Sequence, residues 1–281
     1  MYEYLPSRPD RLICDDPIGV FDSGVGGLSV LREIRRELPT EHLLYVADSG
    51  HAPYGDKPRD IITERSLVVA QWLVDQGAKA IVVACNTATG AAAATLRTRF
   101  ELPIIAMEPA LKPAVSLTRS GVVGVLATSQ TLASDKFEAL RGRFDKQARV
   151  LVQPCPGLVE RIEAGDLHSE STSALIADYV LPLLAQGADT LVLGCTHYPL
   201  VRPLIQQIAG DQVIIADAGV AVARQLRHRL TRQRLLSTRN ASGHDRFWSS
   251  GHPDKATALI ATLWERPVSV GQLTAMCPCE Q

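Results

Sequence analysis

Short apolar runs alternate along this chain with longer stretches in which apolar residues recur every three or four positions. Residues 17–22 form the first apolar run, and Leu28, Leu31, Ile34 and Leu38 follow it at helical spacing. Strands and helices that alternate in this way are typical of a parallel α/β fold. The pattern predicts strands at 17–22, 42–48, 80–85, 103–108, 121–128, 148–155, 190–195, 211–218 and 247–251, and helices at 28–38, 63–77, 89–100, 129–144, 156–165, 171–187, 199–210, 219–230 and after 251.

Two segments of the chain repeat one another. Residues 75–85 (DQGAKAIVVAC) resemble residues 185–195 (AQGADTLVLGC), which begin 110 positions later. The 281 residues are enough for two cores. We therefore predict two similar open α/β domains with mainly parallel sheets, related by a pseudo-twofold axis, with the active site in the cleft between them. One domain comprises residues 1–110 plus 217–281, with 1–17 as a leader, and the other comprises 111–216.

Each repeated segment ends in a cysteine, Cys85 or Cys195, at the carboxyl end of a predicted strand. In open α/β sheets this edge binds ligands. A single cysteine there is more often a small buried apolar residue, but two at matching positions favour a function. Two thiols facing one cleft could act as acid and base on opposite faces of a small substrate. A helix that starts after each thiol would lower the pKa of that thiol.

Other polar residues lie at the same edge of the predicted sheets. His197 could orient the Cys195 thiol or relay its proton, although a single histidine is more often structural. Asp22 could be catalytic or could cap the next helix. The loop 22–29 (DSGVGGLS) lacks the lysine of a phosphate loop and the spacing of a dinucleotide fingerprint, but its N–H groups could bind a carboxylate. Short neutral donors accompany it, without arginine, and predict a small anionic ligand: Ser23, Asn86, Thr87, Thr128 and Thr196.

Composition narrows the class of protein. The formal net charge is −1, so no overall field attracts nucleic acid or an anionic membrane. The amino-terminal residues lack the apolar core of a signal peptide and no membrane-spanning apolar run occurs, so we expect a cytoplasmic protein. Disulfides are not expected among six cysteines in that compartment. Cys277 and Cys279 form a lone CxC pair, which is too little for a metal site, and we expect none.

Five motifs in a fixed order resemble those of the glutamate racemases, within the aspartate/glutamate racemase superfamily. They are FDSGVGGLSV (21–30), PYG (53–55), VVACNTAT (82–89), GVLAT (124–128) and LGCTHYPL (193–200). The resemblance covers about residues 18–225, and FWSSG (247–251) is similar to the proteobacterial branch. It implies interconversion of L- and D-glutamate without a cofactor, a supply of D-glutamate for peptidoglycan, and a homodimer.

The resemblance also implies roles for individual residues. Cys85 would take the α-proton from D-glutamate and Cys195 from L-glutamate, with the opposite thiol returning a proton. Asp22 would assist Cys85, and His197 would assist Cys195. Glu163 would add an acidic group near the second thiol, although Glu160 lies on the same helix face and stays an alternative. The implied substrate contacts are Asp22, Ser23, Tyr54, Gly55, Asn86, Thr87, Thr196 and His197.

Two other functions stay open from the sequence. A racemase of aspartate or another acidic amino acid would use the same thiols, because cavity depth decides between such substrates. A two-domain amino-acid-binding protein without enzymatic activity has no need of two matched thiols, which disfavours it.

Overall fold

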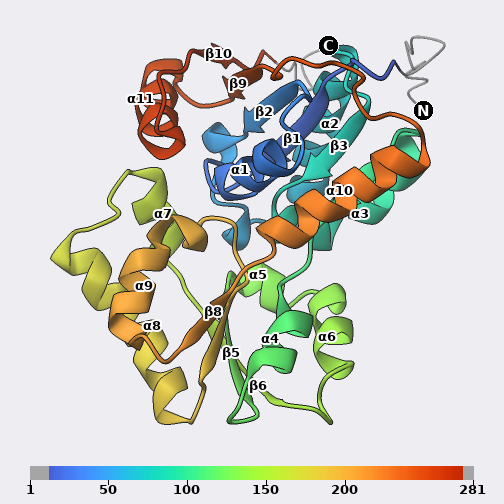
Figure 1. Cartoon of the computed structure of the whole chain (residues 1–281). Coiled ribbons are helices and arrows are strands. Elements are labelled where there is room, and N and C mark those ends of the chain that lie inside the picture. The colour runs from blue at the N-terminus through green and yellow to red at the C-terminus, as the bar shows by residue number, and fades with distance from the viewer. Residues whose placement is uncertain (1–12, 275–281) are drawn as a thin grey trace.

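The strands of this protein form two separate parallel sheets (Figure 1). The computed structural model describes residues 13–274, so most of the predicted leader and the Cys277–Cys279 pair lie outside the described residues. Every strand pair within both sheets is parallel. The predicted fold class, two open α/β units with parallel sheets, is confirmed.

The larger sheet takes its strands from both ends of the chain. Its half contains β1 (Ile18–Asp22), α1 (Leu28–Glu37), β2 (Leu43–Ala47), η1 (Ser49–His51), η2 (Tyr54–Asp56), α2 (Arg59–Asp75), β3 (Ala80–Val83), α3 (Asn86–Arg99), β4 (Ile104–Ala106), α10 (Gly219–Arg232), β9 (Asp245–Ser249), α11 (Pro253–Trp264) and β10 (Val270–Gln272). The strand order is β10-β9-β2-β1-β3-β4. Ile18 and Val20 pack with α1, α10 and α11, whereas Phe21 packs with α2 and α3. Helices thus cover both faces, which explains the continuous apolar runs of the strands.

The smaller sheet is built from the middle of the chain. Its half contains α4 (Leu111–Leu117), β5 (Val122–Ala127), α5 (Ser129–Leu132), α6 (Asp135–Gly142), β6 (Arg149–Pro154), α7 (Leu158–Glu163), α8 (Glu170–Ala185), β7 (Thr190–Leu193), η3 (Tyr198–Val201), α9 (Arg202–Ala209) and β8 (Ile214–Ala216). The order β6-β5-β7-β8 repeats the order β2-β1-β3-β4 of the larger sheet. The sequence repeat therefore falls on equivalent strands, β3 and β7.

The chain crosses between the halves twice, after β4 and after β8. After the second crossing α10 returns to pack against α1, as Figure 1 shows. The crossings fall near the predicted domain limits, residues 110 and 217, and the limits themselves stay a prediction.

Several elements differ from the sequence pattern. The helix predicted at 129–144 is two helices, because the hydroxyls of Thr128 and Ser134 cap α5 and α6 separately. The α2 helix starts at Arg59, directly after Pro58, rather than at residue 63. The predicted set lacks α4, of seven residues, and β10, of three, because such short elements show too little of a pattern. None of the helices within residues 13–274 has both the length and the apolar character needed to span a bilayer.

A buried ion pair closes the amino-terminal end of the larger sheet. Nζ of Lys79 lies 2.5 Å from Oε2 of Glu41, and both side chains are buried. Lys79 also donates to the carbonyl oxygen of Cys14, and the backbone N–H of Ser237 donates to Oε1 of Glu41 at 2.8 Å. The pair therefore connects the segment before β1 to the polar connection between α10 and β9.

Replacing Lys79 by methionine is expected to lower the free energy of unfolding by about 3–5 kcal/mol, because Glu41 would stay buried without its partner. Urea unfolding followed by circular dichroism measures this. The control is Arg36→Ala at the exposed Arg36–Glu33 pair, where a loss of about 0–1 kcal/mol is expected. Equal losses in the two variants would contradict the importance of the buried pair.

Candidate active site

Both cysteines of the repeat line one small cavity between the halves. Cys85 lies two residues beyond β3 in the larger sheet, and Cys195 lies two residues beyond β7 in the smaller sheet. The carboxyl ends of the two sheets therefore border the same space. The cavity has a volume of about 10 Å³ for the centre of a water molecule, which is room for roughly one water. The other lining residues are Ser23, Pro53, Tyr54, Gly55, Asn86, Thr87, Thr128, Val159, Thr196 and His197.

Cys85 lies directly before α3. Its sulfur accepts a hydrogen bond from the backbone N–H of Ala88 at 3.4 Å, and its thiol lies 3.8 Å from Oγ of Ser23. The sequence pattern predicts that this helix terminus lowers the pKa of the thiol, and the structure corrects that expectation. Burial, and after it the charge of Asp22, raises the pKa of Cys85 well above its usual value, and the Ala88 N–H offsets only part of the increase. Cys85 is therefore a thiol, and not a thiolate, in this closed cavity.

Cys195 is paired with an imidazole instead of a helix terminus, because a turn and η3 follow it. Its sulfur lies 3.7 Å from Nδ1 of His197, and Nε2 of the same ring lies 2.6 Å from Oε1 of Glu163. Burial lowers the pKa of His197, but the hydrogen bonds to Cys195 and Glu163 outweigh it and the net pKa lies well above the usual value. The raised pKa favours the protonated ring, which places a positive charge beside the Cys195 sulfur.

The loop between β1 and α1 binds two carboxylates of the protein itself. Val25 N–H donates to Oε1 of Glu163 at 2.6 Å, and Gly27 N–H donates to Oδ2 of Asp22 at 2.5 Å. Ser23 N–H donates to the other oxygen of Asp22 at 2.7 Å. The sequence predicts an anion at this loop, and the anions found there are side chains from both halves.

The glycines of this loop allow the other half to approach closely. A Cβ atom on Gly24 would overlap the carboxylate of Glu163, and one on Gly26 would overlap the ring of His197. Ser49, which follows β2, donates its hydroxyl to Oε2 of Glu163 at 3.1 Å. Backbone atoms of the larger half thus contact the acidic and basic side chains of the smaller half directly.

Asp22 is completely buried behind the cavity lining. The hydroxyl of Ser23 donates to Oδ1 and that of Thr196 donates to Oδ2, each at 3.2 Å. Burial raises the pKa of Asp22, while the charge of His197 and a hydrogen bond from Cys85 lower it. Asp22 therefore interacts with one residue beside each thiol: Ser23, which lies near Cys85, and Thr196, which follows Cys195 in the chain.

The two glutamates that the sequence left open occupy different places on α7. Glu163 contacts His197, as described above. Glu160, one turn earlier, does not line this cavity and lies with Asp56 and Cys155 around a neighbouring pocket. Of these two glutamates, only Glu163 forms a hydrogen bond with His197, the ring that lies beside Cys195.

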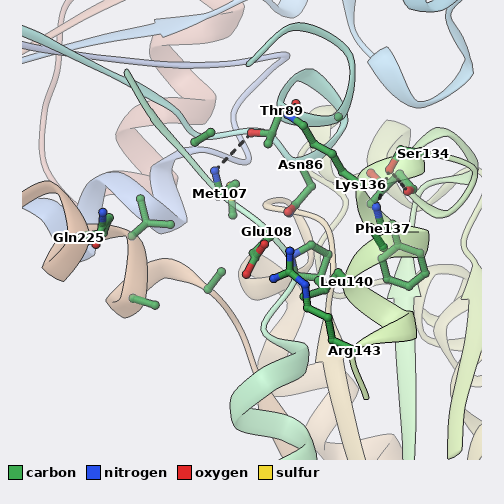
Figure 2. A pocket seen from close by; sticks show the side chains of 18 of the residues that line it. Asn86, Thr89, Met107, Glu108, Ser134, Lys136, Phe137, Leu140, Arg143 and Gln225 are labelled. Carbon is green, nitrogen blue, oxygen red and sulfur yellow. Dashed lines mark hydrogen bonds between the residues drawn. The ribbon is translucent and has the colours of Figure 1, made fainter. Parts of the chain in front are cut away.

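Asn86 carries a buried amide without a partner among the described residues. Neither Oδ1 nor Nδ2 makes a hydrogen bond, although buried amide groups are nearly always paired. The residue lines the small cavity and also a second cavity of about 480 Å³. Figure 2 shows its side chain directed into this second cavity, which Glu108 and Arg143 also line. An unpaired amide at this position is free to bind a polar ligand.

The second cavity lies where the chain first crosses between the halves. Lys136 of α6 donates to the carbonyl oxygen of Thr89 in α3 at 2.6 Å, and the backbone N–H of Met107 donates to Oγ1 of Thr89 at 3.3 Å (Figure 2). Burial lowers the pKa of Lys136. The first turn of α3, which begins directly after Cys85, is thus bonded to the smaller half and to the crossing segment.

Comparison with known proteins identifies the family. Residues 18–226 match the model of the Asp/Glu/Hydantoin racemase family. The chain belongs to this family. It is 58% identical over 252 residues to the glutamate racemase of Stutzerimonas stutzeri, covering 89% of this chain and 95% of that protein.

Solved members of the family share the fold. A glutamate racemase isoform from Bacillus anthracis superposes with a TM-score of 0.84 at 31% identity, covering 92% of this chain and 97% of the other. The glutamate racemase of Francisella tularensis in complex with D-glutamate gives a TM-score of 0.81 at 28% identity, covering 94% and 99%. The resemblance inferred from the five motifs is therefore confirmed.

Three contacts of the site have no signal in the sequence pattern. They are the bonds from the Val25 N–H and the Ser49 hydroxyl to Glu163, and the bond from the Ser29 hydroxyl to the Thr196 carbonyl oxygen. Each joins residues more than a hundred positions apart, and backbone donors and single serines carry no motif. Among residues 13–274, no group of three or more His, Cys, Asp or Glu side chains is arranged to hold a metal ion.

Proposed function

We propose that this protein is a glutamate racemase that uses Cys85 and Cys195 as its two acid/base groups. One observation carries the proposal: the two thiols stand at equivalent positions of a repeated unit and line the same cavity. Racemisation requires proton removal from one face of Cα and proton delivery to the other. Two groups on opposite sides of one space meet that requirement, whereas a single thiol would return the proton to the face it came from.

The structure suggests which thiol acts as the base and which as the acid in each direction. Near neutral pH Cys85 carries a proton and the Cys195 sulfur lies beside an imidazolium. With L-glutamate bound, Cys195 acts as the thiolate and removes the α-proton: a sulfur lone pair forms the S–H bond, and the electron pair of the broken C–H bond stays on Cα. Cys85 then donates its proton to the opposite face. With D-glutamate the reaction starts from the form in which the two protonation states are exchanged: Cys85 is then the thiolate that removes the α-proton, and the Cys195 thiol donates to the opposite face.

Electrostatic contacts stabilise the charges that form. His197, hydrogen-bonded to Glu163, holds a positive charge beside Cys195, and Asp22 interacts with Cys85. The proposed reaction uses no cofactor, so hydrogen bonds to the substrate carboxylates stabilise the carbanion in a site that excludes water. We assign these bonds to cavity residues: the side chains of Ser23, Thr87 and Thr196, and the backbone at Tyr54, Gly55 and Asn86.

The small cavity has to open before glutamate enters, because it holds only about one water molecule. We propose that the halves separate to admit substrate and close over it. The domain limits at residues 110 and 217 would then be the points of bending. The D-glutamate bound to the Francisella tularensis relative supports glutamate as the ligand.

The remaining proposals follow from the family. The product D-glutamate would serve peptidoglycan synthesis, and the protein would act in the cytoplasm as a homodimer. Neither nucleic acid nor a membrane is proposed as a partner.

The function is tested by incubating the purified protein with L-glutamate in deuterated water. We expect the rotation of the solution to fall to zero while the α-hydrogen is replaced by deuterium. A parallel incubation uses L-aspartate. Racemisation of aspartate while glutamate stays unchanged would favour an aspartate racemase. Binding of glutamate with neither exchange nor racemisation would favour a binding protein.

A further inference from the structure

Ser29 lies in the first turn of α1, in the half that carries Cys85, yet its hydroxyl contacts the loop that carries Cys195. Its Oγ atom lies 2.9 Å from the carbonyl oxygen of Thr196 and 2.8 Å from that of Gly26. Thr196 stands between Cys195 and His197 in the chain. Resting on the proposed function, we propose that Ser29 is a positioning residue for the second thiol: it fixes the backbone between Cys195 and His197 against the half that carries the first.

The carbonyl oxygen of Thr196 depends on this hydroxyl. In a turn it would accept from the N–H of residue 199, but residue 199 is proline and has none. The next N–H, that of Leu200, donates to His197 instead. Ser29 is the one donor to the Thr196 oxygen among the described residues.

The second acceptor of Ser29 does not depend on the hydroxyl. A hydroxyl has a single proton to donate, so the two carbonyl oxygens compete for it. The Gly26 oxygen also accepts the backbone N–H of Ser29 at 3.0 Å, and that bond survives loss of the side chain. Removing the hydroxyl therefore leaves only the Thr196 oxygen without a donor.

The contact acts on geometry between the halves. The Thr196 hydroxyl donates to Asp22, and the Thr196 carbonyl oxygen accepts from Ser29, so the larger half holds both of these groups. The Cys195 sulfur has to reach one face of the Cα atom of the substrate, and Cys85 has to reach the other face. Small displacements of a reacting group slow proton transfer strongly. Ser29 therefore contributes to the step at Cys195 and not to the step at Cys85.

Isotope effects separate these two steps. L- and D-glutamate have equal free energies, so kcat/KM has to be the same in both directions for every variant. Deuterium at Cα of L-glutamate reports proton removal by Cys195, and deuterium at Cα of D-glutamate reports removal by Cys85. For Ser29→Ala we expect kcat/KM to fall about tenfold in both directions, because a displaced Cys195 sulfur transfers the proton more slowly. The isotope effect on kcat/KM should rise with L-glutamate and fall with D-glutamate.

Three further variants test whether the hydroxyl of Ser29 causes these changes. Ser29→Thr retains the hydroxyl and should retain the isotope effects of the unmodified protein. Ser29→Cys keeps the shape with a weaker donor and should shift both effects in the same directions as Ser29→Ala, even if the alanine variant folds poorly. Ser116→Ala removes a hydroxyl bonded within α4 and should change neither effect. Isotope effects in Ser29→Ala and Ser29→Cys that stay constant, or that move together, would overturn the proposal. An unmodified protein without racemase activity would instead refute the proposed function.

Discussion

Replacing either cavity thiol by alanine is expected to abolish racemisation while leaving hydrogen exchange at one enantiomer. Cys85→Ala keeps Cys195, so L-glutamate should exchange its α-hydrogen for deuterium in deuterated water without forming D-glutamate. Cys195→Ala should exchange D-glutamate only. We expect racemisation to fall by about 10³-fold or more, because each thiol takes part as an acid or a base in every turnover. Proton NMR of the α-position, combined with chiral chromatography, measures both quantities.

Cys155 provides the matched control for these variants. It is a buried thiol whose hydrogen donates to the carbonyl oxygen of Gln153, and burial raises its pKa to about 12. It does not line the cavity of Cys85 and Cys195. Cys155→Ala should therefore racemise glutamate at close to the unmodified rate. Exchange of both enantiomers by one single-thiol variant would show that one sulfur reaches both faces of Cα, and the two-thiol mechanism would be wrong.

Glu163→Gln is expected to lower kcat/KM by about 10²-fold and to move the alkaline limb of the pH profile to lower pH. Glu163 is one cause of the raised pKa of His197, and a neutral amide removes that contribution. In the unmodified protein the imidazolium persists above the usual histidine pKa and is lost as the pH rises through the raised value. In the variant this loss should begin at lower pH. Initial rates between neutral and alkaline pH give both profiles.

Glu160→Gln is the control for this prediction, because it makes the same change one turn earlier on α7 and outside the cavity. Its rate and pH profile should match those of the unmodified protein. If Glu160→Gln shifted the profile and Glu163→Gln did not, the charge that raises the pKa of His197 would have to come from Glu160.

The sequence was sufficient for the architecture because the architecture depends on local patterns. Short continuous apolar runs predicted most of the strands, and apolar residues every three or four positions predicted most of the helices. The repeat of 75–85 at 185–195 predicted two similar sheets. Those patterns failed where an element was too short or a single side chain decided the outcome. Three residues form β10, and the Ser134 hydroxyl separates α5 from α6.

By itself, the sequence determined that two thiols occupy equivalent strand ends and that the chain resembles the racemases, since both facts follow from the order of residues. The tertiary structure alone decided which glutamate contacts His197 and that Ser29 reaches Thr196. It also decided that burial raises the pKa of Cys85 by more than the helix terminus lowers it. Hydrogen bonds and burial act across a few ångströms in space, and the partners here are separated by many positions in the chain: Val25 and Glu163 by 138, Ser29 and Thr196 by 167. No local pattern encodes such distances, because they arise only when the two halves pack against each other.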